Sequence, residues 1–172
     1  MVFVTAMDDT ADTFLIVVAG SLRAALPRAD AAEVLPLPAL HRPPSSPKAL
    51  EGFMNLGGEA VAVLSLERLL APQSERAEPG LYAHLVRLKA PRQDMALLVD
   101  RVIAADAAAQ TSSPIAPDDS LNGVLSSNLL VDGELVPRLD VSRLLGAYEQ
   151  AKLEEMTRQA QARLADWGAD AP

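Results

Sequence analysis

The chain has 172 residues, of which 49% are hydrophobic and 3% aromatic, which suits one domain or two small interlocked ones with an aliphatic core. Its net charge of −8 argues against nucleic acid, whose binding depends on phosphate neutralisation by Lys and Arg. It has no cysteine, which excludes disulfides and thiol chemistry. Residues 1–12 lack the features of a signal peptide, and no apolar run approaches a membrane span, so we expect a flexible tail on a cytoplasmic protein without membrane insertion.

Two strands are expected at the start of the folded part. Residues 14–19 are apolar on both faces, which is typical of a buried strand, and residues 22–26 follow a Gly-Ser pair as the return strand. A short segment over 31–35 comes next. Residues 36–47 contain too many prolines for a helix or a central strand, so we expect a connection there.

The stretch that follows is repeated later in the chain. Residues 58–70, GEAVAVLSLERLL, and residues 133–145, GELVPRLDVSRLL, align without a gap and share Gly, Glu, Val, Leu, Arg, Leu and Leu. Gly57-Gly58 and Asp132-Gly133 stand where the copies begin, and such pairs favour a type I′ turn, in which both residues have positive φ. An internal repeat of this kind indicates that one structural unit is used twice.

Each copy is expected to have the same elements after its turn. A strand covers 60–64 in the first copy and 135–139 in the second. Ser65 and Asp140 then occupy the N-cap position of a helix, where a side-chain oxygen accepts from a free backbone N–H. The apolar residues that follow recur with the i, i+3, i+4 spacing of a short helix. The repeated unit is therefore a hairpin, a cap and a short helix.

The second half replays the first after a polar boundary at 71–80. We expect a strand over 81–88 and a return strand over 95–99. Residues 104–119 are rich in Ala, Ser and Pro, which indicates a long connection. Short strands separated by turn signals favour small β-barrels over a parallel sheet.

The end of the sequence, residues 148–168, is expected to be a helix that stops at Gly168. An apolar stripe with helical spacing is formed by Leu153, Met156, Ala160, Leu164 and Trp167. Because an isolated helix of this length is marginal in water, the stripe must be covered. Either the protein's own strands or a partner helix can cover it, and the short linker before the helix favours the protein's own strands.

Few residues could form a site for chemistry. His41 and His84 are the only histidines, and neither has the spacing of a metal ligand. Asp8-Asp9 and Asp118-Asp119 are paired carboxylates, but they stand in polar segments that we expect to be solvated. The sequence has neither a phosphate-binding glycine motif nor a nucleophile elbow. We therefore expect no catalytic, cofactor-binding or metal-binding residues, and no enzymatic activity.

One carboxylate interrupts an apolar stretch. Asp100 stands in ALLVDRVI, where a carboxylate usually accepts from backbone N–H groups at a turn or helix start. We expect that structural role for Asp100, which leaves the neighbouring Arg101 exposed and free to meet a partner.

Four short motifs stand in order along the chain: Glu33-Val34, the proline loop 44–47, GFMNLGG at 52–58 and ALLVDRV at 96–102. In their order and separation they resemble the motifs of CheW-like adaptor domains of bacterial chemosensory systems. In the family, the motif matched by Glu33-Val34 ends a short helical segment, so the resemblance implies one at that position.

The resemblance also implies the fold class. It implies a mostly β protein with two SH3-like, five-stranded β-barrel subdomains that share a core, followed by the C-terminal helix. The CheW-like domain would span 13–147, with one subdomain at about 13–75 and the other at about 80–147.

The function that the resemblance implies is that of a non-catalytic scaffold, which links the cytoplasmic tip of a methyl-accepting chemoreceptor to the regulatory domain of a CheA-type histidine kinase. Receptor tips are helical hairpins, so the contact is expected to be an apolar groove. The residues expected to bind partners are Glu33, Val34, Leu35, Asn55, Leu56, Gly57, Gly58, Leu98, Val99 and Arg101. Leu98 and Val99 are expected to form the floor of the groove.

One departure from the family pattern bears on the partners. Gly57 stands where the family has an Arg in its N-L-R-G motif, which removes a long cation from an exposed loop. Arg28 or Arg101 could supply the missing charge. Two alternatives therefore stay open: a specialised variant that binds one partner only, and an SH3-like interaction module unrelated to chemosensing.

Overall fold

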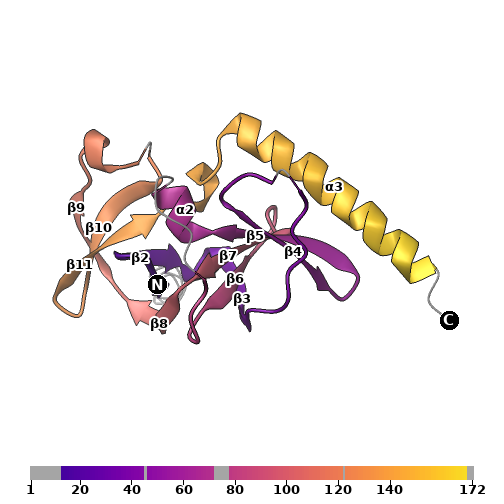
Figure 1. The fold of residues 1–172 in the computed structure, drawn as a ribbon. Helices are drawn as coiled ribbons and strands as arrows, with labels where there is room; N and C mark the ends of the chain where they lie inside the picture. The colour runs from indigo at the N-terminus through magenta and orange to yellow at the C-terminus, as the bar shows by residue number, and fades with distance from the viewer. Residues whose placement is uncertain (1–12, 45, 72–77, 122, 170–172) are drawn as a thin grey trace, which may run out of the picture.

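The computed structural model describes residues 13–44, 46–71, 78–121 and 123–169, which form two β-sheets and a long C-terminal helix (Figure 1). Sheet A has six strands in the order β8-β1-β2-β11-β10-β9. They are β1 (Thr13–Ala19), β2 (Leu22–Pro27), β8 (Arg101–Ala108), β9 (Gln110–Pro114), β10 (Leu125–Val131) and β11 (Glu134–Leu139). Sheet B has five strands in the order β3-β6-β7-β5-β4. They are β3 (Ala31–Pro36), β4 (Leu50–Leu56), β5 (Glu59–Ser65), β6 (His84–Leu88) and β7 (Met95–Val99).

Short helical elements connect these strands. They are the 3-10 turns η1 (Arg28–Asp30), η2 (Pro117–Asp119) and η3 (Val141–Arg143), and the helix α2 (Leu66–Leu70). The C-terminal helix α3 (Ala147–Ala169) contacts β5 and β4 and extends beyond sheet B (Figure 1). In the described ranges, no helix has the length and apolar character needed to cross a membrane.

Both faces of each sheet carry buried side chains, as expected for strands such as β1 that are continuous apolar runs. In β1, Leu15 and Val17 point into a core that the two sheets share, whereas Phe14 and Ile16 point into a smaller core of sheet A. Sheet B has its own small core on the face away from the shared one. That core contains Met54, Val61, Val63, Ala83, Leu85, Ala96 and Leu98. The expected fold class, two SH3-like β subdomains around a shared core with a C-terminal helix, is confirmed, although sheet A has six strands.

The two sheets exchange strands between the halves of the chain. β1 and β2 come from the first half but lie in sheet A, next to β8 and β11, while β6 and β7 come from the second half and lie in sheet B. Each sheet therefore contains strands from both halves of the chain. Parallel pairing of β5 with β7, and of β11 with β2, joins the two halves within each sheet.

The repeated unit has the predicted structure in both copies. Gly57 and Gly58 have φ of 60° and 93°, and Asp132 and Gly133 have φ of 49° and 81°, so all four turn residues have positive φ. Both predicted N-caps are also confirmed. In the first copy the Ser65 Oγ accepts from a backbone N–H of α2. In the second copy the Asp140 carboxylate accepts from a backbone N–H of η3, which is a 3-10 turn instead of an α-helix.

Two predictions from the sequence were wrong about strands. Residues 31–36 form strand β3 and not the end of a helical segment, because pairing with β6 places Val34 opposite Val86 and overrides the helix propensity of Ala and Glu. Residues 104–119 contain most of β8 and all of β9 instead of a long connection. Small side chains suit these strands because Ala104 and Ala107 pack into the confined core of sheet A.

The C-terminal helix lies against the protein's own core, as we favoured. Leu153 and Ala160 are buried in the shared core, and Met156 and Leu164 are packed against it. The side chain of Trp167, the fifth member of the predicted stripe, lies outside the part of the chain that the structure describes. Residues 1–12, where we expected a flexible tail, also lie outside it. The helix therefore covers sheet B above β5 and β4.

Candidate partner-binding surface

The hairpin between β4 and β5 carries the central part of the predicted binding surface. The side chain of Asn55 holds the turn, because its Oδ1 accepts from the backbone N–H of Gly58 at 2.8 Å. A Cβ atom added at Gly57 would meet no atom within 4 Å. The turn is therefore rigidly closed by Asn55, while the position of the absent family Arg is open to solvent.

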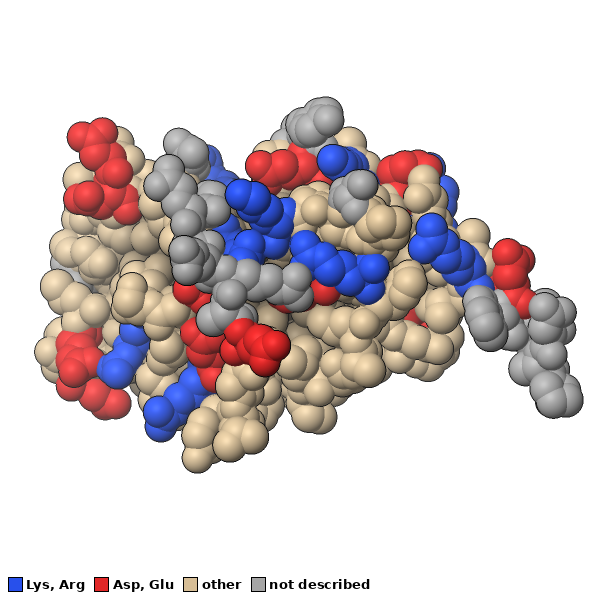
Figure 2. All heavy atoms as spheres, viewed as in Figure 1, with Lys and Arg blue, Asp and Glu red and all other residues tan. Residues whose placement is uncertain are grey.

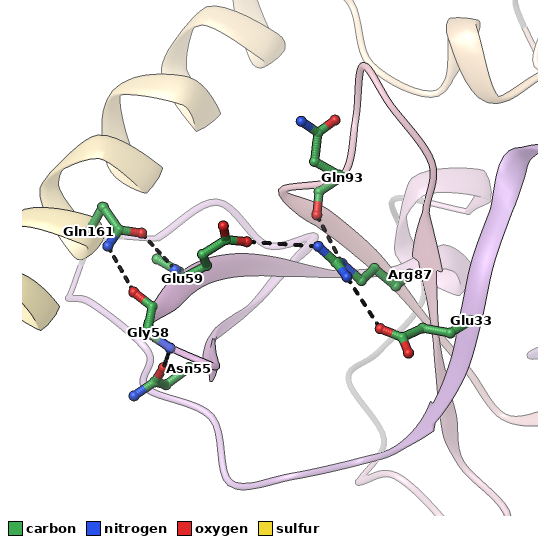
Figure 3. Close-up of polar contacts among 8 residues, drawn as sticks. Glu33, Asn55, Gly58, Glu59, Arg87, Gln93 and Gln161 are labelled. Carbon is green, nitrogen blue, oxygen red and sulfur yellow. Dashed lines mark hydrogen bonds and ion pairs between the residues drawn. The ribbon is translucent and has the colours of Figure 1, made fainter.

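The C-terminal helix fixes this hairpin through a single amide (Figure 3). The Oε1 of Gln161 accepts from the backbone N–H of Ala60 at 2.8 Å, and its Nε2 donates to the carbonyl oxygen of Gly58 at 3.0 Å. The parallel strand β7 begins to pair with β5 only where Met95 meets Ala62. Gln161 thus supplies an acceptor for Ala60, in the part of β5 that β7 leaves unpaired, and a donor for Gly58 in the turn before β5.

A cation that the sequence analysis missed connects three parts of sheet B (Figure 3). Arg87 of β6 lies with one Nη 3.3 Å from a carboxylate oxygen of Glu33, and with the other 3.8 Å from Glu59, which follows the hairpin turn. Its Nε donates to the backbone carbonyl of Gln93 at 3.2 Å. The sequence did contain a sign of this role, because Arg87 is a cation inside a predicted apolar strand. Arg28 and Arg101, which we expected to replace the family Arg, do not lie beside the hairpin as Arg87 does. Arg28 donates to the carbonyl of Ala31, and Arg101 lies in sheet A.

The predicted binding residues divide into an exposed and a buried group. The exposed or half-exposed residues are Glu33, Val34, Asn55, Gly57, Gly58 and Arg101. Leu35 and Leu56 are half-buried against the small core of sheet B, to which Leu98 belongs with only 9% of its surface exposed. Val99 is 2% exposed and belongs to the shared core. Leu98 and Val99, which we expected to form the floor of a groove, therefore point to opposite faces of sheet B.

Asp100 and Arg101 lie where the two sheets meet. The carboxylate of Asp100 accepts from the backbone N–H of Gly20 at 2.7 Å, which confirms the predicted role of Asp100 at a turn. Arg101 is exposed, and its guanidinium carbon is 5.9 Å from the centroid of the Tyr82 ring. Tyr82 is 69% exposed and follows Leu81, which is 97% exposed. This corner of the molecule therefore presents a cation beside exposed apolar side chains, a combination that favours protein contacts.

The described residues offer no alternative site for metal chemistry, since no group of three or more His, Asp or Glu side chains in them could hold a metal ion. The surface combines a hairpin held by Asn55 and Gln161 with exposed apolar side chains on a β scaffold.

Comparisons with known proteins agree with this architecture. The family described as CheW-like domain matches residues 13–149. The structure is similar to the crystal structure of the scaffolding protein TtCheW from Thermoanaerobacter tengcongensis, with a TM-score of 0.69 and 16% identity over 80% of this chain and 89% of that chain. No curated protein matches the sequence significantly. Because the family match covers most of the chain, the protein belongs to the CheW-like domain family.

Proposed function

We propose that the protein is a non-catalytic adaptor of a bacterial chemosensory array, which links the cytoplasmic tip of a methyl-accepting chemoreceptor to the regulatory domain of a CheA-type histidine kinase. The family match over residues 13–149 carries this proposal, and it favours a chemosensory adaptor over an unrelated SH3-like module. On this proposal the protein acts in the cytoplasm, at the receptor array, and needs no cofactor.

For the receptor contact, the proposed surface is the exposed part of the predicted set. Val34 is 39% exposed on β3, an edge strand of sheet B, and Glu33 beside it is oriented by Arg87. The rigid hairpin tip at Asn55 and Gly58 belongs to the same sheet. Leu35, Leu56 and Leu98 support this surface from the small core beneath it, and Val99 supports it from the shared core.

For the kinase contact, the proposal has two forms, which differ in whether the adaptor binds the kinase although Gly57 replaces the family Arg. An open, side-chain-free turn at Gly57 favours a specialised adaptor that binds the receptor alone and tunes the composition of an array. Arg87 lies next to the same hairpin but is paired with Glu33 and Glu59, so an adaptor that keeps both partners would use it only if the kinase replaces one of these carboxylates.

Titration of the full chain with two purified partners separates these forms. One partner is a fragment of a chemoreceptor cytoplasmic tip, and the other is the isolated regulatory domain of a CheA-type kinase, both taken from the genome that encodes this chain. A coupling adaptor binds both, and the specialised form binds the receptor fragment only. Binding to neither partner by calorimetry would refute the proposed function.

A further inference from the structure

A concave surface lies away from the β4–β5 hairpin, between α2, η3 and the first turns of α3. It is a groove of about 740 Å³, within the range of roughly 300–1,000 Å³ that is typical of ligand pockets. Its apolar lining includes Leu50, Leu64, Leu69, Leu144, Leu145 and Leu153. None of the ten predicted partner-binding residues lines it. The groove is therefore distinct from the surface proposed above for the receptor.

The rim of this groove is cationic in an otherwise acidic protein. Four cationic side chains line it, from Lys48, Arg68, Arg143 and Lys152, against the one carboxylate of Glu149. The whole chain carries a net charge of −8. Figure 2 shows Lys and Arg side chains gathered on the face where Figure 1 places α2 and the beginning of α3. The charge of the groove is thus opposite in sign to that of the molecule.

These cations are largely unpaired. Within the described residues, the side chains of Lys48, Arg68 and Lys152 form no ion pair. Arg143 has a single long contact, 3.6 Å from its Nε to a carboxylate oxygen of Asp140, and its side chain is 63% exposed. Exposed contacts of this kind contribute little to stability. The cations are therefore available to a ligand of negative charge.

We propose that this groove binds an acidic amphipathic helix of a partner protein. The leucine-rich floor suits the apolar stripe of such a helix, and the cations on the rim suit carboxylates that flank the stripe. The walls include α2, η3 and the first turns of α3. An anionic membrane is disfavoured as the occupant, because the surface is concave.

The test uses the full chain and a designed probe. The probe is a fluorescein-labelled, end-capped peptide of about 18 residues with Leu at i, i+3, i+4 and i+7 and Glu on the flanks of that stripe. A scrambled peptide of the same composition is its control. Fluorescence anisotropy should show saturable binding of the amphipathic peptide alone. Raising NaCl from about 0.05 to about 0.5 M should weaken this binding, since the contacts between charges are exposed.

Matched variants of the protein locate the binding site. The double variant Arg68→Gln, Lys152→Gln should bind the peptide about tenfold more weakly, equivalent to about 1.4 kcal/mol. The double variant Arg42→Gln, Lys89→Gln removes the same charges from exposed positions outside the groove and should bind as the wild type does. Leu121→Asn removes apolar surface from the lining, and Asn is well suited to the φ of 52° at that position, so it should weaken binding without loss of folding.

Several outcomes would overturn the proposal. They are the absence of saturable binding at millimolar peptide, equal binding of the scrambled peptide, and equal loss in the two double variants. Sedimentation with phosphatidylglycerol vesicles provides the remaining comparison. Vesicle binding that depends on Arg68 and Lys152, without peptide binding, would assign the groove to a lipid surface and refute a helical partner.

Discussion

The side-chain amide of Gln161 completes the hydrogen bonding of β5 by accepting from the backbone N–H of Ala60 at 2.8 Å. Ala60 is buried, so its N–H has no access to bulk water if this acceptor is lost. The contact joins the C-terminal helix to the hairpin that carries the proposed binding surface. The C-terminal helix therefore stabilises the hairpin of the proposed binding surface.

Replacement of Gln161 should destabilise the protein. Gln161→Ala removes both hydrogen bonds to the hairpin and leaves the buried N–H of Ala60 unpaired, which should lower the free energy of unfolding by about 1–3 kcal/mol. Gln159→Ala is the matched control, because among the described residues the Gln159 side chain has one hydrogen bond, to Glu155 of its own helix at 3.4 Å. Urea denaturation measures both variants, and faster hydrogen exchange at Ala60 should appear in the first alone. Equal stabilities would contradict the role given to Gln161.

Removal of the C-terminal helix should have a larger effect. A chain that ends at Tyr148 loses Leu153 and Ala160 from the shared core. Burial of one Leu side chain alone stabilises a protein by about 1.5–3 kcal/mol, which corresponds to a fall of roughly 4–10 °C in Tm for a chain of this size. The truncation should leave the oligomeric state at low concentration unchanged. An unchanged Tm for the truncated chain would show that the helix is held by a partner instead.

The features that the sequence predicted correctly are those that depend on residues close together in the chain. The turns at Gly57 and Asp132 and the caps at Ser65 and Asp140 were predictable, since each depends on residues at most three positions apart. β8 and β9 were missed because Ala- and Ser-rich strands lack an apolar alternation, and only the confined core of sheet A explains their small side chains.

The support of the candidate site was missed for a related reason. Gln161 is 101 positions from Ala60, and Arg87 is 54 positions from Glu33. Nothing near either residue in the sequence indicates its partner, because both contacts arise from strand order and helix placement. The partner-binding role of the exposed positions is still a prediction from the resemblance. The separation of Leu98 and Val99 onto opposite faces follows from strand alternation, which the expectation of a shared floor overlooked.

Val34 provides the direct test of the proposed receptor surface. Val34→Asp places a charge on an exposed apolar position of an edge strand, so it should weaken binding of a receptor-tip fragment about tenfold or more, as loss of a central contact does. Stability should change by less than about 1 kcal/mol, because the side chain is exposed. Leu135→Asp makes the same change at a 58% exposed Leu in sheet A and should leave receptor binding intact. Equal effects of the two substitutions would exclude Val34 from the contact.

The last prediction concerns the cation that the hairpin lacks. Gly57→Arg has free space for its side chain, but the φ of 60° places a non-glycine residue in the left-handed region at a cost of roughly 1–2 kcal/mol in stability. Gly57→Asn is the control for this backbone effect, since Asn adopts the left-handed region more readily than other residues.

If the absent Arg accounts for a weak kinase contact, Gly57→Arg should bind the kinase regulatory domain about fivefold more tightly than Gly57→Asn, as one added charged hydrogen bond of about 1 kcal/mol would allow. Receptor binding should be the same in both variants. If Arg87 already supplies the charge through Glu59, the added Arg should have no benefit, and Arg87→Gln should instead weaken kinase binding. Calorimetry of the three variants against both partners decides between these arrangements. Equal kinase affinity in all three would exclude a cation at this hairpin from the contact.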